Sequence, residues 1–250
     1  MCNFRGVIQQ SITNNHQGSH SKRYKEFTKL FRIMNPLLKL IFLGFEFIIL
    51  FFGIPILIFL DTGFIHPSVV LLPVLIVIIL LLRFSTDFTF KELIILNITR
   101  REVLRNAIVM LTSGIFMLLM VLLMDRENLF NLPKGNIVVW ILLCTFYPVF
   151  SAYGQEIIYR TFLFRRYKIL FKNDRLIILS SGIAFSFMHI VYYSPISMVL
   201  TLIGGLYLAY VYSKTRSVLF TAILHGILGI LVFTVGLGHY FWLDMFEYIH

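Results

Sequence analysis

The sequence predicts an all-α protein, a polytopic transmembrane helix bundle with about seven spans. Three observations predict this fold class. Hydrophobic residues fill 58% of the 250 positions and charged residues only 14%, whereas soluble domains are nearer half apolar and a quarter charged. Seven apolar runs are close in length to the ~20 residues that cross a bilayer. Lysine and arginine gather in alternate connections between these runs.

The first half of the chain is predicted to contain a basic tail and three spans. Residues 1–36 carry six lysines and arginines and form the tail. The spans are predicted at 37–60, 68–82 and 107–124, the second being short and interrupted by Pro73. Basic and apolar residues interleave over 83–105, which is typical of an amphipathic helix in the membrane interface. Glu46 lies within the first span, and we expect it to pair with Lys39 or a polar neighbour.

The second half is predicted to contain four spans, at 137–164, 176–193, 195–212 and 218–237. An aromatic tail at 239–250 follows and could enter the membrane as an eighth short helix. Residues 37–250 are therefore expected to form a single integral-membrane domain. The Gly204-Gly205 pair indicates close helix packing inside it.

The distribution of positive charge predicts the orientation. From the N-terminal tail onward, the connections hold six, zero, five, two, five, zero and two lysines and arginines, and the C-terminal tail holds none. The positive-inside rule then places the N-terminus in the cytoplasm. The net charge of +10 is thereby explained by topology, and no nucleic-acid partner is expected.

Ionisable residues inside the spans are the candidates for chemistry, because charges at membrane depth are costly and usually have a partner or a function. Glu156 and Arg160 are four residues apart and share one helix face. On its own, this pair is best interpreted as a structural ion pair. Each of the two histidines, His189 and His225, is on its own best interpreted as a residue hydrogen-bonded to a neighbouring helix. Taken together, three spans could bring a carboxylate and two imidazoles to one polar pocket, where such groups activate water and stabilise an oxyanion.

Several other intramembrane protease chemistries are excluded by motif. The sequence has no H-E-x-x-H for a zinc peptidase, and its aspartates lie outside the span interiors. Ser181-Gly182 lacks the preceding glycine of a rhomboid-like site. Cys2 and Cys144 provide neither a disulfide framework nor a paired metal motif. What remains is glutamate plus histidine. We expect no cofactor, although two histidines and a glutamate could hold a divalent metal.

Three motifs occur in order along the last four spans: Glu156-Ile-Ile-Tyr-Arg160, then Phe185-x-x-x-His189, then His225. Together they resemble the CAAX protease and bacteriocin-processing family (CPBP, or Abi) over about 137–237. That family's pattern is E-E-x-x-x-R, F-x-x-x-H and H-x-x-x-N in successive membrane helices. The resemblance implies a helical, glutamate-dependent intramembrane endopeptidase with Glu156, His189 and His225 as catalytic residues. It implies supporting roles for Gln155, Arg160, Phe185 and Gly229.

The sequence departs from that pattern at two positions. Gln155 replaces the first glutamate, the family's presumed water-activating base, and an amide cannot take up a proton at working pH. Gly229 replaces the asparagine that follows the last histidine, a presumed oxyanion donor. Glu156 lies about 100° from position 155 around a helix and is not a simple substitute. Both changes affect chemistry rather than fold.

The function expected from the resemblance is hydrolysis of a peptide bond by water that glutamate and histidine activate. The substrate would be a peptide or lipid-modified protein, reached from the cytoplasmic half of the membrane, with membrane lipid as the surrounding partner. The alternative is a catalytically inactive member that acts as a membrane binding, immunity or scaffold protein. A small-solute transporter is a third, weaker alternative, because no internal repeat is visible. The expected location is a bacterial plasma membrane.

Overall fold

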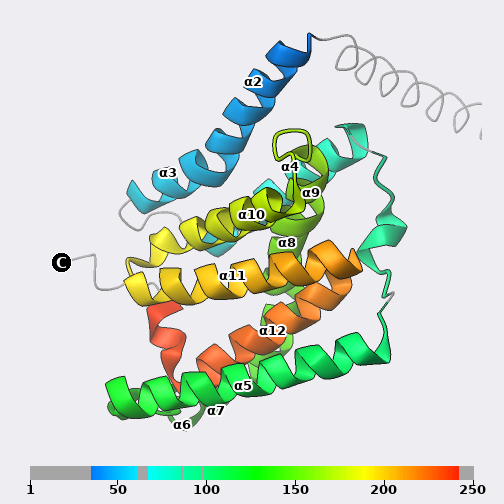
Figure 1. Cartoon of the computed structure of the whole chain (residues 1–250). Coiled ribbons are helices and arrows are strands. Elements are labelled where there is room, and N and C mark those ends of the chain that lie inside the picture. The colour runs from blue at the N-terminus through cyan, green and yellow to red at the C-terminus, as the bar shows by residue number, and fades with distance from the viewer. Residues whose placement is uncertain (1–34, 61–66, 86, 97, 242–250) are drawn as a thin grey trace, which may run out of the picture.

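The computed structural model describes residues 35–60, 67–85, 87–96 and 98–241, and within them every regular element is helical (Figure 1). The first elements are α2 (Pro36–Ile48), η1 (Ile49–Gly53), α3 (Ile54–Leu60), α4 (Pro67–Ser85), η2 (Phe90–Leu93), α5 (Arg100–Met124), η3 (Arg126–Asn128) and α6 (Asn131–Gly135). Then follow α7 (Ile137–Phe146), η4 (Tyr147–Ala152), α8 (Tyr153–Glu156), η5 (Ile157–Phe162) and α9 (Leu163–Arg166). The last are α10 (Asp174–Met188), η6 (His189–Tyr192), α11 (Pro195–Thr215), α12 (Val218–Val235) and η7 (Leu237–Phe241).

The predicted fold class is confirmed. Within the described residues, six helices are long and apolar enough to cross a membrane, and Val69–Phe84 is a shorter apolar helix at the predicted second span. The six are Pro36–Leu60, Arg100–Met124, Ile137–Arg166, Asp174–Tyr192, Pro195–Thr215 and Val218–Val235. The cytoplasmic N-terminus stays a prediction. Residues 1–34 of the N-terminal tail and residues 242–250 of the C-terminal tail, where an eighth helix was considered, lie outside the described residues.

Side-chain caps explain where the last three spans begin. The side chains of Asn173, Ser194 and Ser217 accept hydrogen bonds from backbone amides in the first turns of α10, α11 and α12. Each cap provides a partner for an amide that has none inside its own helix. At the other end of α12, Gly236 has φ of +119°, a conformation that side chains disfavour. The three caps thus define where α10, α11 and α12 begin, and Gly236 defines where α12 ends.

The amphipathic helix predicted over 83–105 is wrong. Among the described residues between α4 and α5 (87–96 and 98–99), only η2 is helical, and Arg100, Arg101 and Arg105 belong to the first turns of α5. The reason is a capping box: the Thr99 side chain accepts from the Glu102 amide, and the Glu102 carboxylate accepts from the Thr99 amide. This reciprocal pair starts a new helix at residue 100. It extends the third span into the basic segment.

The span Ile137–Arg166 lies at the centre of the bundle and is irregular. Two π-helical stretches, η4 and η5, interrupt its α-helical turns. Pro148 has no amide hydrogen to donate to the carbonyl of Cys144, which favours a wider turn at that point. Such π-helical bulges are frequent at functional sites because they re-aim side chains.

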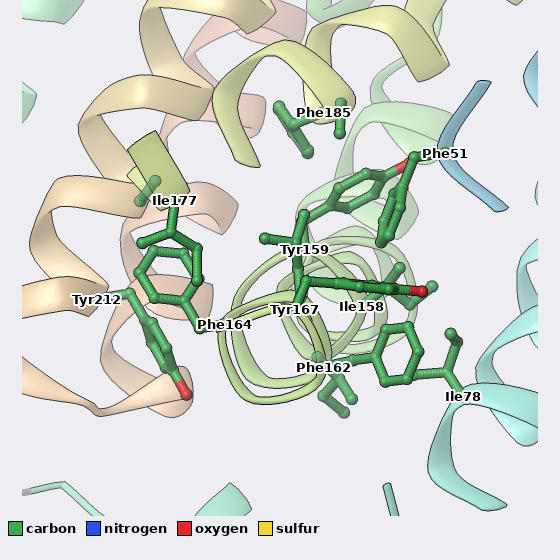
Figure 2. Close-up of a cluster of buried hydrophobic side chains, with 14 of the residues drawn as sticks. Phe51, Ile78, Ile158, Tyr159, Phe162, Phe164, Tyr167, Ile177, Phe185 and Tyr212 are labelled. Carbon is green, nitrogen blue, oxygen red and sulfur yellow. The ribbon is translucent and has the colours of Figure 1, made fainter. Parts of the chain in front are cut away.

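The main apolar core surrounds the second half of this span. Tyr159, Phe162 and Tyr167 pack with Phe51 of η1 and Ile78 of α4, all at most 5% exposed (Figure 2). The helices α10, α11, α12 and α5 lie side by side in that order, with α2–α3 beyond α10 (Figure 1). The central span therefore contacts helices from both ends of the chain.

An ion pair joins the first span to the end of the central one. The Glu46 carboxylate accepts two hydrogen bonds from Arg166, at 2.9 and 2.8 Å, and a third from the Tyr167 hydroxyl at 2.8 Å. Two parallel N–H···O bonds are the strong, bidentate form of this interaction. Glu46 thus has polar neighbours, as expected, and they position α2 against α9.

Candidate active site

One face of the central span presents polar side chains at every fourth residue. Tyr147, Ser151 and Gln155 all line the same cavity, and the amide of Gln155 donates to the Ser151 hydroxyl at 2.9 Å. Residues four apart lie on one side of a helix. Gln155, at the place where the resemblance expects a base, therefore faces the cavity with the Ser151 hydroxyl beside it.

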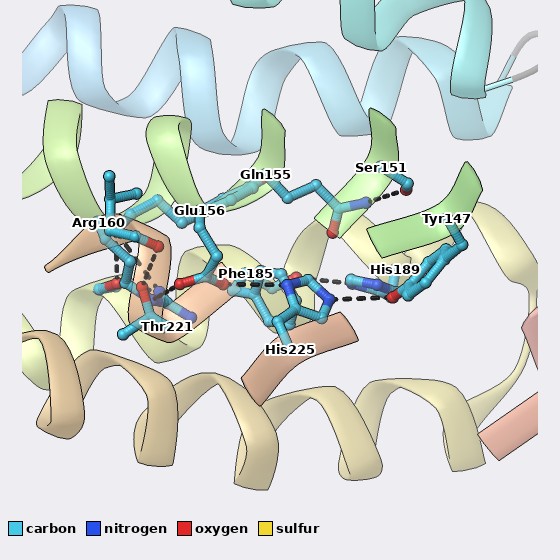
Figure 3. A network of polar contacts seen from close by, with 12 residues as sticks. Tyr147, Ser151, Gln155, Glu156, Arg160, Phe185, His189, Thr221 and His225 are labelled. Atoms are coloured by element: carbon cyan, nitrogen blue, oxygen red, sulfur yellow. Dashed lines mark hydrogen bonds and ion pairs between the residues drawn. The ribbon is translucent and has the colours of Figure 1, made fainter. Parts of the chain in front are cut away.

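Glu156 leaves the same helix in another direction (Figure 3). Its carboxylate is fully buried, with Oε2 3.0 Å from Nε of Arg160 and Oε1 3.0 Å from Nδ1 of His225. It lines neither of the two cavities described below. The divergence of Gln155 and Glu156 follows from the ~100° between successive residues of a helix.

Arg160 and Phe185 support this carboxylate. The Arg160 guanidinium is fully buried and donates to the Ser181 hydroxyl on α10. It also lies 5.3 Å from the centre of the Phe185 ring, a cation–π distance. The Phe185 ring contacts both histidines, with ring centres 4.9 Å from His189 and 5.3 Å from His225. The Phe185 ring is therefore an apolar neighbour of the Arg160 guanidinium and of both imidazole rings.

His225 connects Glu156 to the cavity. Since Oε1 of Glu156 can only accept while the carboxylate is ionised, Nδ1 of His225 carries the hydrogen of this contact. The opposite ring nitrogen, Nε2, lies 3.0 Å from the Tyr147 hydroxyl. A carboxylate, an imidazole and a phenol thus form a line that ends at the cavity wall (Figure 3). The carboxylate fixes the ring's orientation and tautomer.

His189 lies in η6, directly after α10 ends. Its Nδ1 is 2.8 Å from the carbonyl oxygen of Phe185. A carbonyl only accepts, so Nδ1 carries the hydrogen and Nε2 of the neutral ring keeps a free lone pair. Since His189 lines the cavity, this ring can act as a proton acceptor there.

Two cavities meet at these residues. The larger has a volume of about 320 Å³ and is bounded mainly by α5, α11 and α12. The smaller, of about 70 Å³, lies toward α2–α3 and α4. Four residues line both cavities and form a shared wall: Ser151, Gln155, His189 and Tyr192. Most other lining residues are apolar, so this wall is a polar strip in a hydrophobic surround.

Two residues that line the larger cavity also belong to the outer surface of the bundle. Phe116 on α5 and Ile203 on α11 line the cavity and are also exposed on the outside, by 57% and 61%. In a membrane, that surface faces lipid. The apolar lining of the cavity thus shares side chains with the outer surface of the bundle.

Most of the residues predicted from the sequence converge. Five of them line the larger cavity: Gln155, Phe185, His189, His225 and Gly229. The other two, Glu156 and Arg160, lie behind His225 and line neither of these two cavities. Sequence reasoning did not single out Tyr147, Ser151 or Tyr192. The four-residue spacing of polar residues at 147, 151 and 155 could have predicted that Tyr147 and Ser151 share a helix face with Gln155.

The donor set was also tested for a metal. Within the described residues, no group of three or more histidine, cysteine, aspartate and glutamate side chains is arranged to hold an ion. The two oxygens of Glu156 already contact Arg160 and His225. These described residues therefore do not form a ready metal centre.

Comparison with known families finds a match to one segment of the chain. Residues 133–231 match the sequence model of the family described as type II CAAX prenyl endopeptidase Rce1-like. This segment is similar to that family. The resemblance predicted from the three motifs is thereby confirmed over a segment that contains all of them. No curated protein and no solved structure matched the chain.

Proposed function

We propose that the protein is an intramembrane endopeptidase of the CAAX-processing type, which hydrolyses a peptide bond in the larger cavity. One observation carries the proposal. The free Nε2 of His189 and the line from Glu156 through His225 to Tyr147 meet at the same cavity. A base for water and a polar group for a carbonyl oxygen are the two requirements of peptide hydrolysis.

His189 is the proposed base. Its Nε2 takes a proton from water, and the hydroxide oxygen bonds to the carbonyl carbon of the scissile peptide. The protonated ring then gives that proton to the leaving amine nitrogen as the C–N bond breaks. The water is consumed, the imidazole returns to its neutral state, and a carboxylic acid and an amine are formed.

Gln155 is proposed to position the water. Its amide nitrogen is held by Ser151, which leaves the amide oxygen to accept a hydrogen bond from a water molecule beside His189. An amide oxygen can orient water but cannot remove its proton. His189 alone would therefore transfer the proton. Because position 155 has no carboxylate to assist it, we expect hydrolysis to be slower than with glutamate there.

Glu156 and Arg160 are proposed to act through His225 and are positioning residues in this scheme. The carboxylate holds Nδ1 of His225, and Arg160 neutralises and fixes the carboxylate. His225 in turn places its Nε2 side at the cavity, where the substrate carbonyl would lie. The substrate is proposed to be a lipid-modified peptide, because the cavity is largely apolar and shares the side chains of Phe116 and Ile203 with the outer surface of the bundle.

The test is cleavage of an S-farnesylated peptide ending in a CAAX sequence by the purified protein in liposomes, with mass-spectrometric detection of the released tripeptide. His189→Ala should reduce the rate by about 10²-fold or more. His239→Ala is the matched control, since His239 pairs with Asp125 and lines neither cavity. Equal cleavage by wild type and His189→Ala, or no cleavage by wild type, would overturn the proposal.

A second candidate function is a non-catalytic binder of the same lipid-modified peptide. Gln155 favours it, because the carboxylate nearest to it, Glu156, lines neither cavity. This candidate predicts that wild type binds the peptide in liposomes but releases no tripeptide. It also predicts that binding is weakened when the cavity is filled by Gly204→Leu, whereas His189→Ala leaves binding unchanged.

A further inference from the structure

Tyr147 and Gly229 share one space in the cavity wall. A Cβ atom built on Gly229 would lie 2.1 Å from Cε1 of Tyr147 and 2.7 Å from its hydroxyl oxygen. No side chain other than hydrogen at position 229 is compatible with the observed position of the tyrosine. The space beside His225 that Gly229 leaves open is therefore occupied by a phenol from the central span.

The backbone around Tyr147 holds the phenol at this place. Tyr147 begins the π-helical stretch η4, and the next residue, Pro148, packs against Gly226 of α12. A Cβ at Gly226 would lie 2.9 Å from Cβ of Pro148. Two glycines on one face of α12 thus let η4 approach closely, and Tyr147 reaches His225 as a result.

The hydroxyl group ends the polar line at the cavity surface. It lies 3.0 Å from Nε2 of His225, and Tyr147 lines the larger cavity together with His189. Three other hydroxyls that line the cavity have partners elsewhere: Ser151 accepts from Gln155, Thr201 donates within its own helix, and Tyr207 donates to Asn106. The Tyr147 hydroxyl is a donor held in place by a histidine that itself contacts a buried carboxylate.

We infer that Tyr147 is a catalytic residue, whose hydroxyl binds the carbonyl oxygen of the scissile bond and stabilises the oxyanion of the tetrahedral intermediate. The inference rests on the proposed function. In the free protein the hydroxyl donates to Nε2 of His225. When substrate enters, the same hydrogen turns to the carbonyl oxygen, which gains negative charge as hydroxide adds to the carbon. No bond to Tyr147 forms or breaks, and its proton stays on the phenol oxygen throughout.

This role also explains Gly229 chemically. The family pattern has an asparagine there, whose amide would donate from α12. Here the donor comes from the opposite side of the same space, and glycine is the residue that makes room for it. In this inference, the Tyr147 hydroxyl takes the place of the asparagine amide as hydrogen-bond donor, and Gly229 provides the space for it.

The experiment compares Tyr147→Phe with Tyr153→Phe, both of which remove one hydroxyl from the central span. Tyr153 donates to the carbonyl of Leu93 at 2.9 Å and lines neither cavity. In the farnesylated-peptide assay, Tyr147→Phe should lower kcat by about 10²-fold with little change in KM, as for other oxyanion donors. Tyr153→Phe should keep the wild-type kcat. An undiminished kcat in Tyr147→Phe would overturn the inference while leaving the proposed function intact.

A binding measurement separates the two proposals if wild type is inactive. The probes are an S-farnesyl-cysteine peptide whose scissile carbonyl is an aldehyde, which hydrates to a tetrahedral form, and the corresponding alcohol. Wild type should bind the aldehyde at least tenfold more tightly than the alcohol, because transition-state analogues gain affinity. Tyr147→Phe should abolish that preference and Tyr153→Phe should keep it. Absence of the preference in wild type, or its persistence in Tyr147→Phe, would overturn the role of Tyr147.

Discussion

Glu156 and His225 lie 69 residues apart in the sequence and meet in a buried contact of 3.0 Å between Oε1 and Nδ1. The carboxylate nearest to the candidate site is thus directed at a ring nitrogen, away from both cavities. Its effect on chemistry must pass through the imidazole. Because Glu156 also pairs with Arg160, changes at this residue should affect stability and activity by different routes.

Glu156→Gln should destabilise the protein by about 3–5 kcal/mol, because Arg160 would remain buried without a counter-charge. Thermal unfolding in detergent micelles measures the loss. The double variant Glu156→Gln/Arg160→Gln should recover part of it, since it buries no net charge. If the double variant were less stable than Glu156→Gln, unpaired charge would not be the cause.

Glu92→Gln provides the matched control. The Glu92–Arg165 ion pair is 28% and 31% exposed, and glutamine retains the reciprocal capping hydrogen bond with Thr89. Exposed pairs contribute at most about 1 kcal/mol. A loss as large as that of Glu156→Gln would contradict the role assigned to burial.

Gln155→Glu should raise the rate of peptide cleavage. The new carboxylate would face both cavities beside Ser151 and His189, where it can accept a proton from water. A positioned general base typically contributes about 10²–10⁴-fold. The measurement is tripeptide release in liposomes, with Gln155→Ala as the control for loss of the amide. An unchanged or lower rate in Gln155→Glu would contradict the placement of residue 155 at the reacting water.

Gly229→Ala should destabilise the protein by about 1–3 kcal/mol, the usual cost of overpacking. The added methyl would lie 2.1 Å from a ring carbon of Tyr147 and must displace it. Gly204→Ala is the control, since a methyl there meets nothing within 4 Å. Thermal unfolding of both variants tests this directly. Equal behaviour of the two alanine variants would show that the space at Gly229 is not restricted.

Much of the fold follows from the sequence because span length and apolar composition are local properties. The segment 83–105 shows the limit of such reasoning. Its interleaved charges fit an interfacial helix, yet the Thr99–Glu102 capping box starts α5 inside it. The capping hydrogen bonds between Thr99 and Glu102 thus determined where the helix begins, and the interleaved basic and apolar residues did not.

The candidate site was predictable only in part, for a related reason. Motif order placed Gln155, His189 and His225 in one region, and helix periodicity separated Glu156 from Gln155. The contribution of Tyr147 depends on a close approach between η4 and α12. Such an approach is a tertiary distance, and no spacing in the sequence specifies it.

Glu46→Gln should weaken the attachment of the first span by about 2 kcal/mol, the scale of hydrogen bonds to a charged group. The glutamine keeps the shape of the side chain but loses the charge that Arg166 contacts, and the Arg166 side chain is 3% exposed. Faster proteolysis near α2, together with a lower unfolding temperature, is the expected result. Glu127→Gln, at an exposed position, serves as the control and should match wild type. Identical proteolysis of the two variants would show that α2 is held by apolar packing alone.

The orientation predicted from the basic connections can be tested with single cysteines. After Cys2 and Cys144 are replaced by serine, Glu127→Cys and Lys172→Cys place one thiol each in connections on opposite sides of the membrane. Both positions are exposed. The connection around Lys172 holds five lysines and arginines and that around Glu127 holds two, so the positive-inside rule puts Lys172 in the cytoplasm. A membrane-impermeant maleimide added to intact cells should label Glu127→Cys at once and Lys172→Cys only after permeabilisation. The reverse pattern would invert the topology and place the N-terminal tail outside.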